Sequence, residues 1–395
     1  MATADTFSPS PSVFAGIDRL GVLIAGLAVA GANLQFVSYG ANRIVSPAPI
    51  GFFAALPQWE ILIVGAILLA AAAIAVVRLQ PRFRLLIGFA ALIALALAVG
   101  DAAQALTPSG DKISRTSPGT GFWLLMLAFA LMTSDAVARM KLKPWSRIAL
   151  LAIVAVALAL LLWLGQWNDL SVLREYANRS KDFWREGGVH VMLALGSLVA
   201  AVVIGLPVGI LCHRAPRVRG AILGVLNAVQ TVPSIALFGL LIAPLAWIAA
   251  TVPGAAAIGI AGIGVTPALI ALFLYSLLPV VANTVVGLEG VPEAANEAAR
   301  GMGMTERERL FGVELPLAFP VILTAVRIVL VQNIGLATVA ALIGGGGFGV
   351  FVFQGVAQTA MDLVLLGAVP TVALAFAAGI VLDAVVELVS PGGRK

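Results

Sequence analysis

The sequence has little charge, one cysteine and two histidines. Charged residues make up 11% of its 395 residues, against about 25% in a soluble domain, so a soluble protein is excluded because too few polar side chains could cover its apolar surface. The single cysteine, Cys212, excludes an internal disulfide, and with the adjacent His213 it falls short of a zinc-binding set. The sequence has no GxxxxGK loop followed by Ser or Thr and no nucleophile–base constellation, so ATP hydrolysis would have to come from another chain.

What the sequence does have is long apolar runs. Hydrophobic residues make up 61% of it and the mean hydropathy is +1.05. Most runs match the roughly 20 residues that a helix needs to cross a bilayer, and a β-barrel would show short alternating segments instead. We therefore predict an all-α polytopic membrane protein with about ten transmembrane helices. The runs lie at about 20–39, 60–79, 84–106, 121–138, 147–164, 190–212, 221–245, 257–286, 317–343 and 362–389.

Positive charge gathers in alternate loops between these runs. The second, fourth, sixth and eighth loops hold Arg78, Arg82, Arg84; Arg139, Lys141, Lys143, Arg147; Arg214, Arg217, Arg219; and Arg300, Arg307, Arg309. Because positively charged loops stay on the cytoplasmic side, we expect a multi-pass protein of the bacterial inner membrane with both termini in the cytoplasm. Short clusters of this kind contact membrane lipid and do not form the basic stripe of a nucleic-acid-binding protein.

The chain changes in character near residue 165. We predict a disordered cytoplasmic N-terminus at 1–19, a five-helix membrane region at 20–165, and a periplasmic amphipathic linker at 166–189 in which charges and aromatic residues alternate. A second membrane region follows at 190–390. Prolines and glycines interrupt residues 236–270, so the number of helices in that stretch stays open.

One loop of the second region, 289–316, is dense in charge. Pro292 and the helix-forming residues from Glu293 predict a first short helix, which Gly301 and Gly303 end by turning the chain. Thr305 and Glu308 form a capping box for a second helix, expected at 306–313 and ended by Leu315-Pro316. The two helices would present an apolar ridge to a partner, made of Ala294, Ala298, Leu310 and Phe311.

The same loop resembles the EAA signature of binding-protein-dependent ABC importer permeases. The match consists of Glu297-Ala298-Ala299, Gly303, Val313 and Leu315-Pro316, with valine where the family prefers isoleucine. Residues 230–239, 283–303 and 342–349 resemble stretches of osmoprotectant permeases, for glycine betaine, choline or proline betaine. The resemblance covers about 190–390 and implies a type I permease core there, preceded by helices found only in a longer form of the subfamily.

This resemblance implies the partners and the site. Glu293, Glu297, Ala298, Ala299, Gly301, Gly303, Val313, Leu315 and Pro316 would dock on a separate ATPase subunit, which holds the ATP and Mg. A periplasmic substrate-binding protein and a second permease subunit, identical or paralogous, would complete the importer, and this chain would bind no cofactor or metal directly and would not be an enzyme. Two alternatives stay open: an ABC permease for another small solute, such as an amino acid or a sulfonate, and an ion-coupled secondary transporter.

Residues of the apolar runs are candidates for the translocation pathway. They are Pro233, Ser234, Phe238, Tyr275, Asn283 and Arg327. Aromatic faces attract quaternary ammonium groups, although core packing explains Phe238 and Tyr275 equally well. Arg327 lies deep in its run, where a charge needs a partner or a water-filled cavity.

Overall fold

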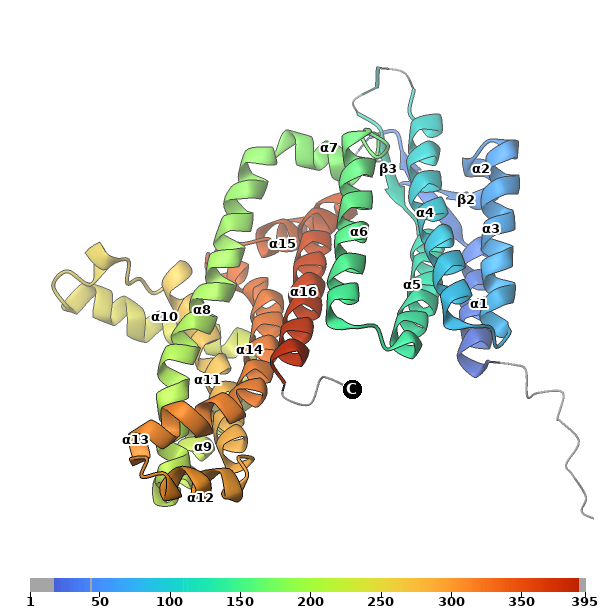
Figure 1. Cartoon of the computed structure of the whole chain (residues 1–395). Helices are drawn as coiled ribbons and strands as arrows, with labels where there is room; N and C mark the ends of the chain where they lie inside the picture. Colours follow the sequence, from blue (N-terminus) through green and yellow to red (C-terminus); the bar gives the residue numbers. More distant parts are fainter. Residues whose placement is uncertain (1–17, 43–44, 109, 112, 391–395) are drawn as a thin grey trace, which may run out of the picture. The chain divides into compact units, whose positions relative to one another are not determined.

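The computed structural model describes residues 18–42, 45–108, 110–111 and 113–390 (Figure 1). The prediction of a disordered N-terminus at 1–19 therefore lies largely outside the described residues. The described chain divides into two compact units, one of residues up to 143 with 156–174, the other of 144–155 with the residues from 175 onward.

The first unit has helices around a small sheet. Its elements are α1 (Arg19–Asn33), β1 (Gln35–Gly40), β2 (Ala48–Gly51), α2 (Phe52–Ala55), α3 (Gln58–Val76), α4 (Pro81–Leu106), β3 (Arg115–Pro118) and α5 (Thr120–Met140), with the end of α6 (Pro144–Trp163) and the start of α7 (Ser171–Asn178). The strands form an antiparallel sheet in the order β2-β1-β3. Neither the sheet nor the end of α1 at Asn33 was predicted. The residues of β1 are largely apolar and directly follow α1, so helix and strand together look like one apolar run at 20–39.

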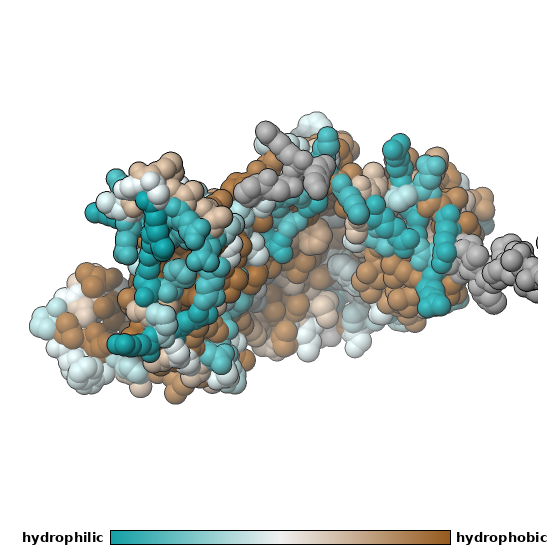
Figure 2. All heavy atoms as spheres, turned by 60° about the horizontal axis from the view of Figure 1, so that its bottom comes forward, coloured by the Kyte–Doolittle hydropathy of each residue, from teal (hydrophilic) through white to brown (hydrophobic). Residues whose placement is uncertain are grey.

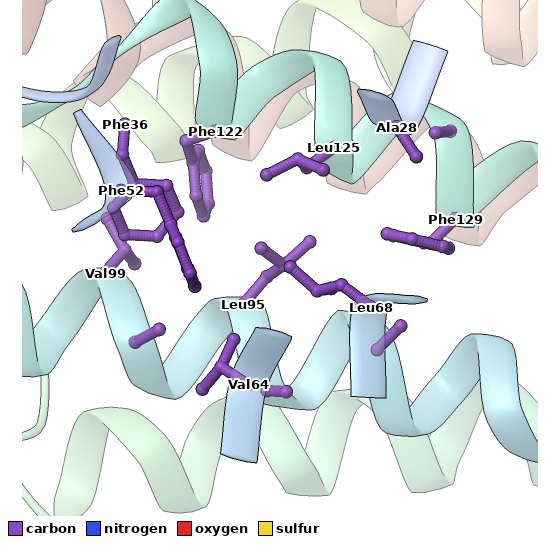
Figure 3. Packing of buried hydrophobic residues seen from close by; sticks show 14 of the residues in the cluster. Ala28, Phe36, Phe52, Val64, Leu68, Leu95, Val99, Phe122, Leu125 and Phe129 are labelled. Atoms are coloured by element: carbon purple, nitrogen blue, oxygen red, sulfur yellow. The ribbon is translucent and has the colours of Figure 1, made fainter. Parts of the chain in front are cut away.

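Aromatic and small residues fill the core of this unit (Figure 3). Phe36 of β1 packs edge-on against Phe52, at 5.3 Å between ring centroids, and against Phe122 of α5 at 5.9 Å. Alanines at buried positions, such as Ala71 and Ala91, let the helices approach closely. The sheet is therefore held by the same core as the helices.

A buried charge cluster joins the ends of four helices in the first unit. Asp18 caps α1 and accepts hydrogen bonds from Arg84 of α4 at 2.5 Å and Arg139 of α5 at 2.7 Å. Arg139 also pairs with Asp135 at 2.8 Å, and Arg84 donates to the Ala75 carbonyl of α3. Burial by itself raises the pKa of Asp18, but the hydrogen bond and the charge of Arg84 outweigh it and lower that pKa. Arg84 is thus a buried structural residue rather than a loop charge.

The second unit contains long helices joined by shorter helical segments. Its elements are α8 (Ser180–Arg214), α9 (Pro216–Thr231), α10 (Ser234–Thr251), α11 (Val265–Glu289), α12 (Glu293–Gly301), α13 (Glu306–Arg309), α14 (Leu315–Ala337), α15 (Gly349–Ala357) and α16 (Met361–Val389), with a π-helical turn at Leu310–Glu314 and 3-10 helices at Ala256–Ile258 and Val339–Ile343. Helices α8, α11 and α14 pack on one another, and α16 packs on α14 and α15.

A small-residue face brings α8 and α11 together. Gly205 and Gly209 lie four residues apart on α8, and a Cβ at Gly209 would come within 2.5 Å of Thr284 on α11. Where these helices meet α14, Asn333 donates to Ser197 and Ser276, each at 2.9 Å. All three polar side chains are buried, so their hydrogen bonds fix the register of the helices.

Nine helices in the described residues are long and apolar enough to cross a membrane, and α1 is a shorter apolar helix. The predicted helical membrane fold is thereby confirmed, apart from the small sheet of the first unit and the differences that follow. The run at 221–245 is not one span, because Pro233 separates α9 from α10, which projects away from the bundle (Figure 1). The stretch 166–189 contains α7, which ends at Asn178, and the first turns of α8, which begins at Ser180, and its role as a periplasmic linker stays a prediction.

Candidate functional site

The first half of the charged loop folds as α12. The helix runs over Glu293–Gly301, directly after Pro292, as predicted. Ala299 is 1% exposed and anchors the helix, whereas Glu293, Glu297 and Ala298 are exposed. The helix therefore presents one face of its EAA residues to solvent and holds the other against its own unit.

Gly303 turns the chain after α12. Its φ is +81°, in the region that residues with a side chain rarely adopt. Two backbone hydrogen bonds close the turn, from Gly303 N–H to the Arg300 carbonyl at 2.9 Å and from Met304 N–H to the Ala299 carbonyl at 3.1 Å. Gly301 is the last residue of α12 and makes no such turn, so of the two glycines only Gly303 has the predicted role.

The capping box is present, but the helix that it starts does not end where predicted. Thr305 accepts from the Glu308 backbone, and the Glu308 carboxylate accepts from Thr305 N–H at 2.8 Å. Helical structure then continues from Glu306 through a π turn into α14, over 32 residues. In this turn Leu315 N–H donates to the carbonyl of Leu310, five residues back. The wider turn accommodates Pro316, so Leu315-Pro316 does not break the helix.

A buried carboxylate holds the loop to α8. Glu314 is 4% exposed and pairs with Arg309 at 2.9 Å and with Arg214 of α8 at 2.8 Å. A second and more exposed pair, Arg219 with Glu289, joins α9 to the end of α11. Sequence reasoning counted these arginines only as topology signals and missed Glu314. The signal that could have identified Glu314 is its position at the start of an apolar run, where a carboxylate needs a partner.

We call the charged loop, residues 289–316, the docking segment, after the role that its resemblance implies. Figure 2 shows hydrophilic side chains gathered over the end of the second unit that carries α12 and α13. Among them lie two exposed apolar side chains, Met302 at 75% and Phe311 at 60%. Of the predicted ridge, Ala294, Ala298 and Phe311 are exposed, whereas Leu310 packs into the unit against Leu288 and Ile322. The segment thus offers a mixed polar and apolar surface.

Three of the pathway candidates come together. Pro233, Ser234 and Tyr275 line a cavity of about 410 Å³ between the α9–α10 break, α11 and α14, with Gln230 and Gln332. Gln230 donates to the Tyr275 carbonyl at 2.8 Å, and the Tyr275 hydroxyl donates to the Val232 carbonyl freed by the break. Phe238 is buried in the core, and Asn283 donates to the Pro279 carbonyl of its own helix, so both lie outside this lining.

Arg327 lies elsewhere, in a larger cavity. It pairs with Asp383 of α16, and both line a cavity of about 820 Å³ between α14 and α16. Asp383 also pairs with Arg147 at 2.9 Å. Gln332, which sequence reasoning missed, lines both cavities. Within the described residues, no group of three His, Cys, Asp or Glu side chains is placed to hold a metal ion.

Two family models match the chain. The binding-protein-dependent transport system inner membrane component matches residues 201–395, and the N-terminal domain of the ABC transporter permease YehY matches residues 18–173. The inward-facing MetNI methionine ABC transporter is a structural neighbour, with a TM-score of 0.48 and 22% identity, over 54% of this chain and 98% of that one.

Similar proteins include three transport permeases. The osmoprotectant import permease OsmW of Salmonella typhimurium is 39% identical over 52% of this chain and 91% of the relative. The carnitine transport permease OpuCB of Listeria monocytogenes is 38% identical over 47% and 78%, and the choline transport system permease OpuBB of Bacillus subtilis is 35% identical over 52% and 88%.

Proposed function

Because this chain belongs to the family of binding-protein-dependent transport system inner membrane components, we propose that it is the permease subunit of an ATP-driven importer of osmoprotectants such as glycine betaine or choline. It is a transport subunit rather than an enzyme, and the ATPase is a separate chain. The relatives named for choline, carnitine and osmoprotectants support this solute class over amino acids or sulfonates. Family membership also decides against the ion-coupled secondary transporter.

The docking segment is the observation that carries this proposal. Its exposed α12 face, the turn at Gly303 and the ion pairs of Glu314 make a stiff projection at the end of the membrane-spanning helices. In the proposed importer this projection inserts into a groove of an ATPase subunit that holds the ATP and Mg. The docking side would then be cytoplasmic, with both termini on that side, in agreement with the positive charge of the loops.

The remaining partners follow from this assignment. A substrate-binding protein would deliver solute on the opposite side of the membrane. A second permease subunit would close the pathway, because one copy leaves the cavities at Tyr275 and Arg327 open at the surface. ATP binding would then switch the assembly between two packings.

The pathway itself would follow α14. Gln332 joins the cavity of Pro233, Ser234 and Tyr275 to the cavity of Arg327, and polar side chains inside membrane-spanning helices mark solute routes. We expect Gln332→Leu to lower uptake about fivefold, the effect of about 1 kcal/mol from one lost polar contact, without loss of ATPase binding. The matched control is Gln358→Leu, at an exposed position at the end of α15. Equal uptake in the two variants would contradict a route past Gln332.

Uptake into vesicles tests the proposed function. The chain is reconstituted with its ATPase and binding protein, and labelled glycine betaine or choline is supplied outside vesicles that contain ATP. We expect uptake that needs ATP and the binding protein and that persists when ionophores abolish Na⁺ and H⁺ gradients. Uptake driven by an ion gradient without ATP would overturn the assignment, and ATP-driven uptake of an amino acid alone would change its solute.

A further inference from the structure

Resting on the proposed function, we propose that Glu186 and His190 of α8 form a latch that holds the far end of α14 in one of the two transport states. The latch lies at the glycine segment, residues 344–349, which follows the 3-10 helix at Val339–Ile343 and leads into α15. Here Gly347 N–H donates to Glu186 Oε2 at 2.8 Å, and the next amide, Phe348 N–H, donates to His190 Nδ1 at 3.3 Å. The two acceptors lie one helical turn apart, so one face of α8 binds two consecutive amides of the segment.

The glycine segment is shaped for this contact. Gly344, Gly346 and Gly347 have φ values of +75°, +75° and +85°, and a Cβ at Gly346 would lie 2.9 Å from Glu186 Oε2. The Phe348 ring packs 5.1 Å from the His190 ring and 5.1 Å from the Phe183 ring. Glu186, His190, Gly347 and Phe348 are all buried. The glycine segment is therefore packed and hydrogen-bonded in this state.

A long helical run and a short 3-10 helix connect the docking segment to the glycine segment. Helical structure is continuous from Glu306 to Ala337, a length of about 48 Å at 1.5 Å per residue. A 3-10 helix at Val339–Ile343 follows this run, so a push on the docking segment reaches the glycine segment through α14 and that 3-10 helix.

Polar contacts join this run and the glycine segment to α8 at three places. They are the Glu314–Arg214 pair near the docking end, the Asn333–Ser197 hydrogen bond near the other end of α14, and the latch beyond that end. In the proposed importer the ATPase drives the docking end, and the Asn333–Ser197 hydrogen bond is buried between two regular helices. The latch alone binds main-chain amides of a segment whose glycines have more than one accessible conformation. If α14 tilts against α8, we expect the two hydrogen bonds of the latch to break before the other contacts between these helices.

Matched substitutions test the latch. Glu186→Ala and His190→Ala remove an acceptor, whereas Glu186→Gln keeps an amide oxygen and His190→Asn keeps an oxygen near the position of Nδ1. ATP hydrolysis and glycine betaine uptake are measured in vesicles on the same assembled complexes, with and without binding protein. We expect each alanine variant to raise hydrolysis without binding protein about fivefold and to lower uptake per ATP, because the bond stabilises one of two states only. The Gln and Asn variants should stay close to the unsubstituted protein.

Hydrogen exchange at residues 344–350 of the purified complex gives an independent readout. We expect faster exchange there in the alanine variants, and in the unsubstituted complex when ATP and vanadate are added. Unchanged hydrolysis and uptake in a Glu186→Ala, His190→Ala double variant, or rates that fall only in proportion to the amount of assembled complex, would show a purely structural contact and overturn the latch. If the unsubstituted complex imports no glycine betaine, the proposed function is wrong and so is the latch proposal that rests on it.

Discussion

Gly303→Val is expected to abolish ATP-coupled uptake while membrane insertion stays intact. The φ of +81° at this position is strained for a β-branched residue by about 1–3 kcal/mol, so the turn would reorganise and move α12 relative to α13. A Cβ at Gly303 meets nothing within 4 Å in this chain, so the effect comes from the backbone and not from a clash. We expect uptake to fall at least tenfold, which about 1.4 kcal/mol of lost docking free energy suffices to produce.

Gly303→Asn is the matched control. Asparagine is the residue after glycine that best tolerates the left-handed region, so this variant should keep most of its ATPase binding and uptake. Both variants are compared by membrane expression, ATPase co-purification and uptake per complex. Wild-type uptake in Gly303→Val would refute the importance of the turn, and equal loss in both variants would point to steric exclusion at the ATPase instead.

Glu314→Ala is expected to have the second large effect, on the stability of the docking segment. The substitution leaves Arg309, which is 6% exposed, without its carboxylate and releases Arg214. Breaking a buried ion pair on one side destabilises proteins by about 3–5 kcal/mol because a charge stays buried without a partner. We expect a clear drop in the thermal unfolding temperature of the purified chain and loss of ATPase co-purification.

Glu289→Ala provides the comparison for Glu314. It removes the partner of Arg219, and both of those side chains are well exposed, at 47% and 36%, so the expected cost is at most about 1 kcal/mol. Each variant removes one glutamate carboxylate, and the two glutamates lie near opposite ends of the docking segment. If they unfold at the same temperature and bind the ATPase equally, Glu314 does not position the segment.

The sequence correctly predicted those features of the docking segment that depend on nearby residues, namely helix starts, caps and the turn. Pro292, the capping residues Thr305 and Glu308, and the turn glycine Gly303 act on neighbours within four residues, so their roles can be read directly from the chain. The end of the second helix was predicted wrongly, because Pro316 usually interrupts a helix and the π turn that accommodates it has no distinct sequence signal.

Long-range partners could not be predicted in the same way. The sequence contains Arg214 and Glu314 but nothing that pairs them across 100 residues, and the same holds for Arg327 with Asp383 and for Gly347 with Glu186. Pro233, Ser234 and Tyr275 were proposed together for the pathway and line one cavity, whereas Phe238 and Asn283, chosen on the same grounds, lie outside it.

The sequence by itself determined that the chain is a helical membrane protein with a capped, charged docking loop, because hydropathy, helix length and capping depend only on residues close together in the chain. Only the tertiary structure decided which charges are buried pairs, where α9 and α10 separate, and that the docking loop continues into α14 as one helix up to Ala337. Those features depend on which side chains, distant in sequence, pack together in the interior. A buried polar group needs a hydrogen-bond or ionic partner to offset its lost hydration, and residues close in sequence do not determine which partner that is.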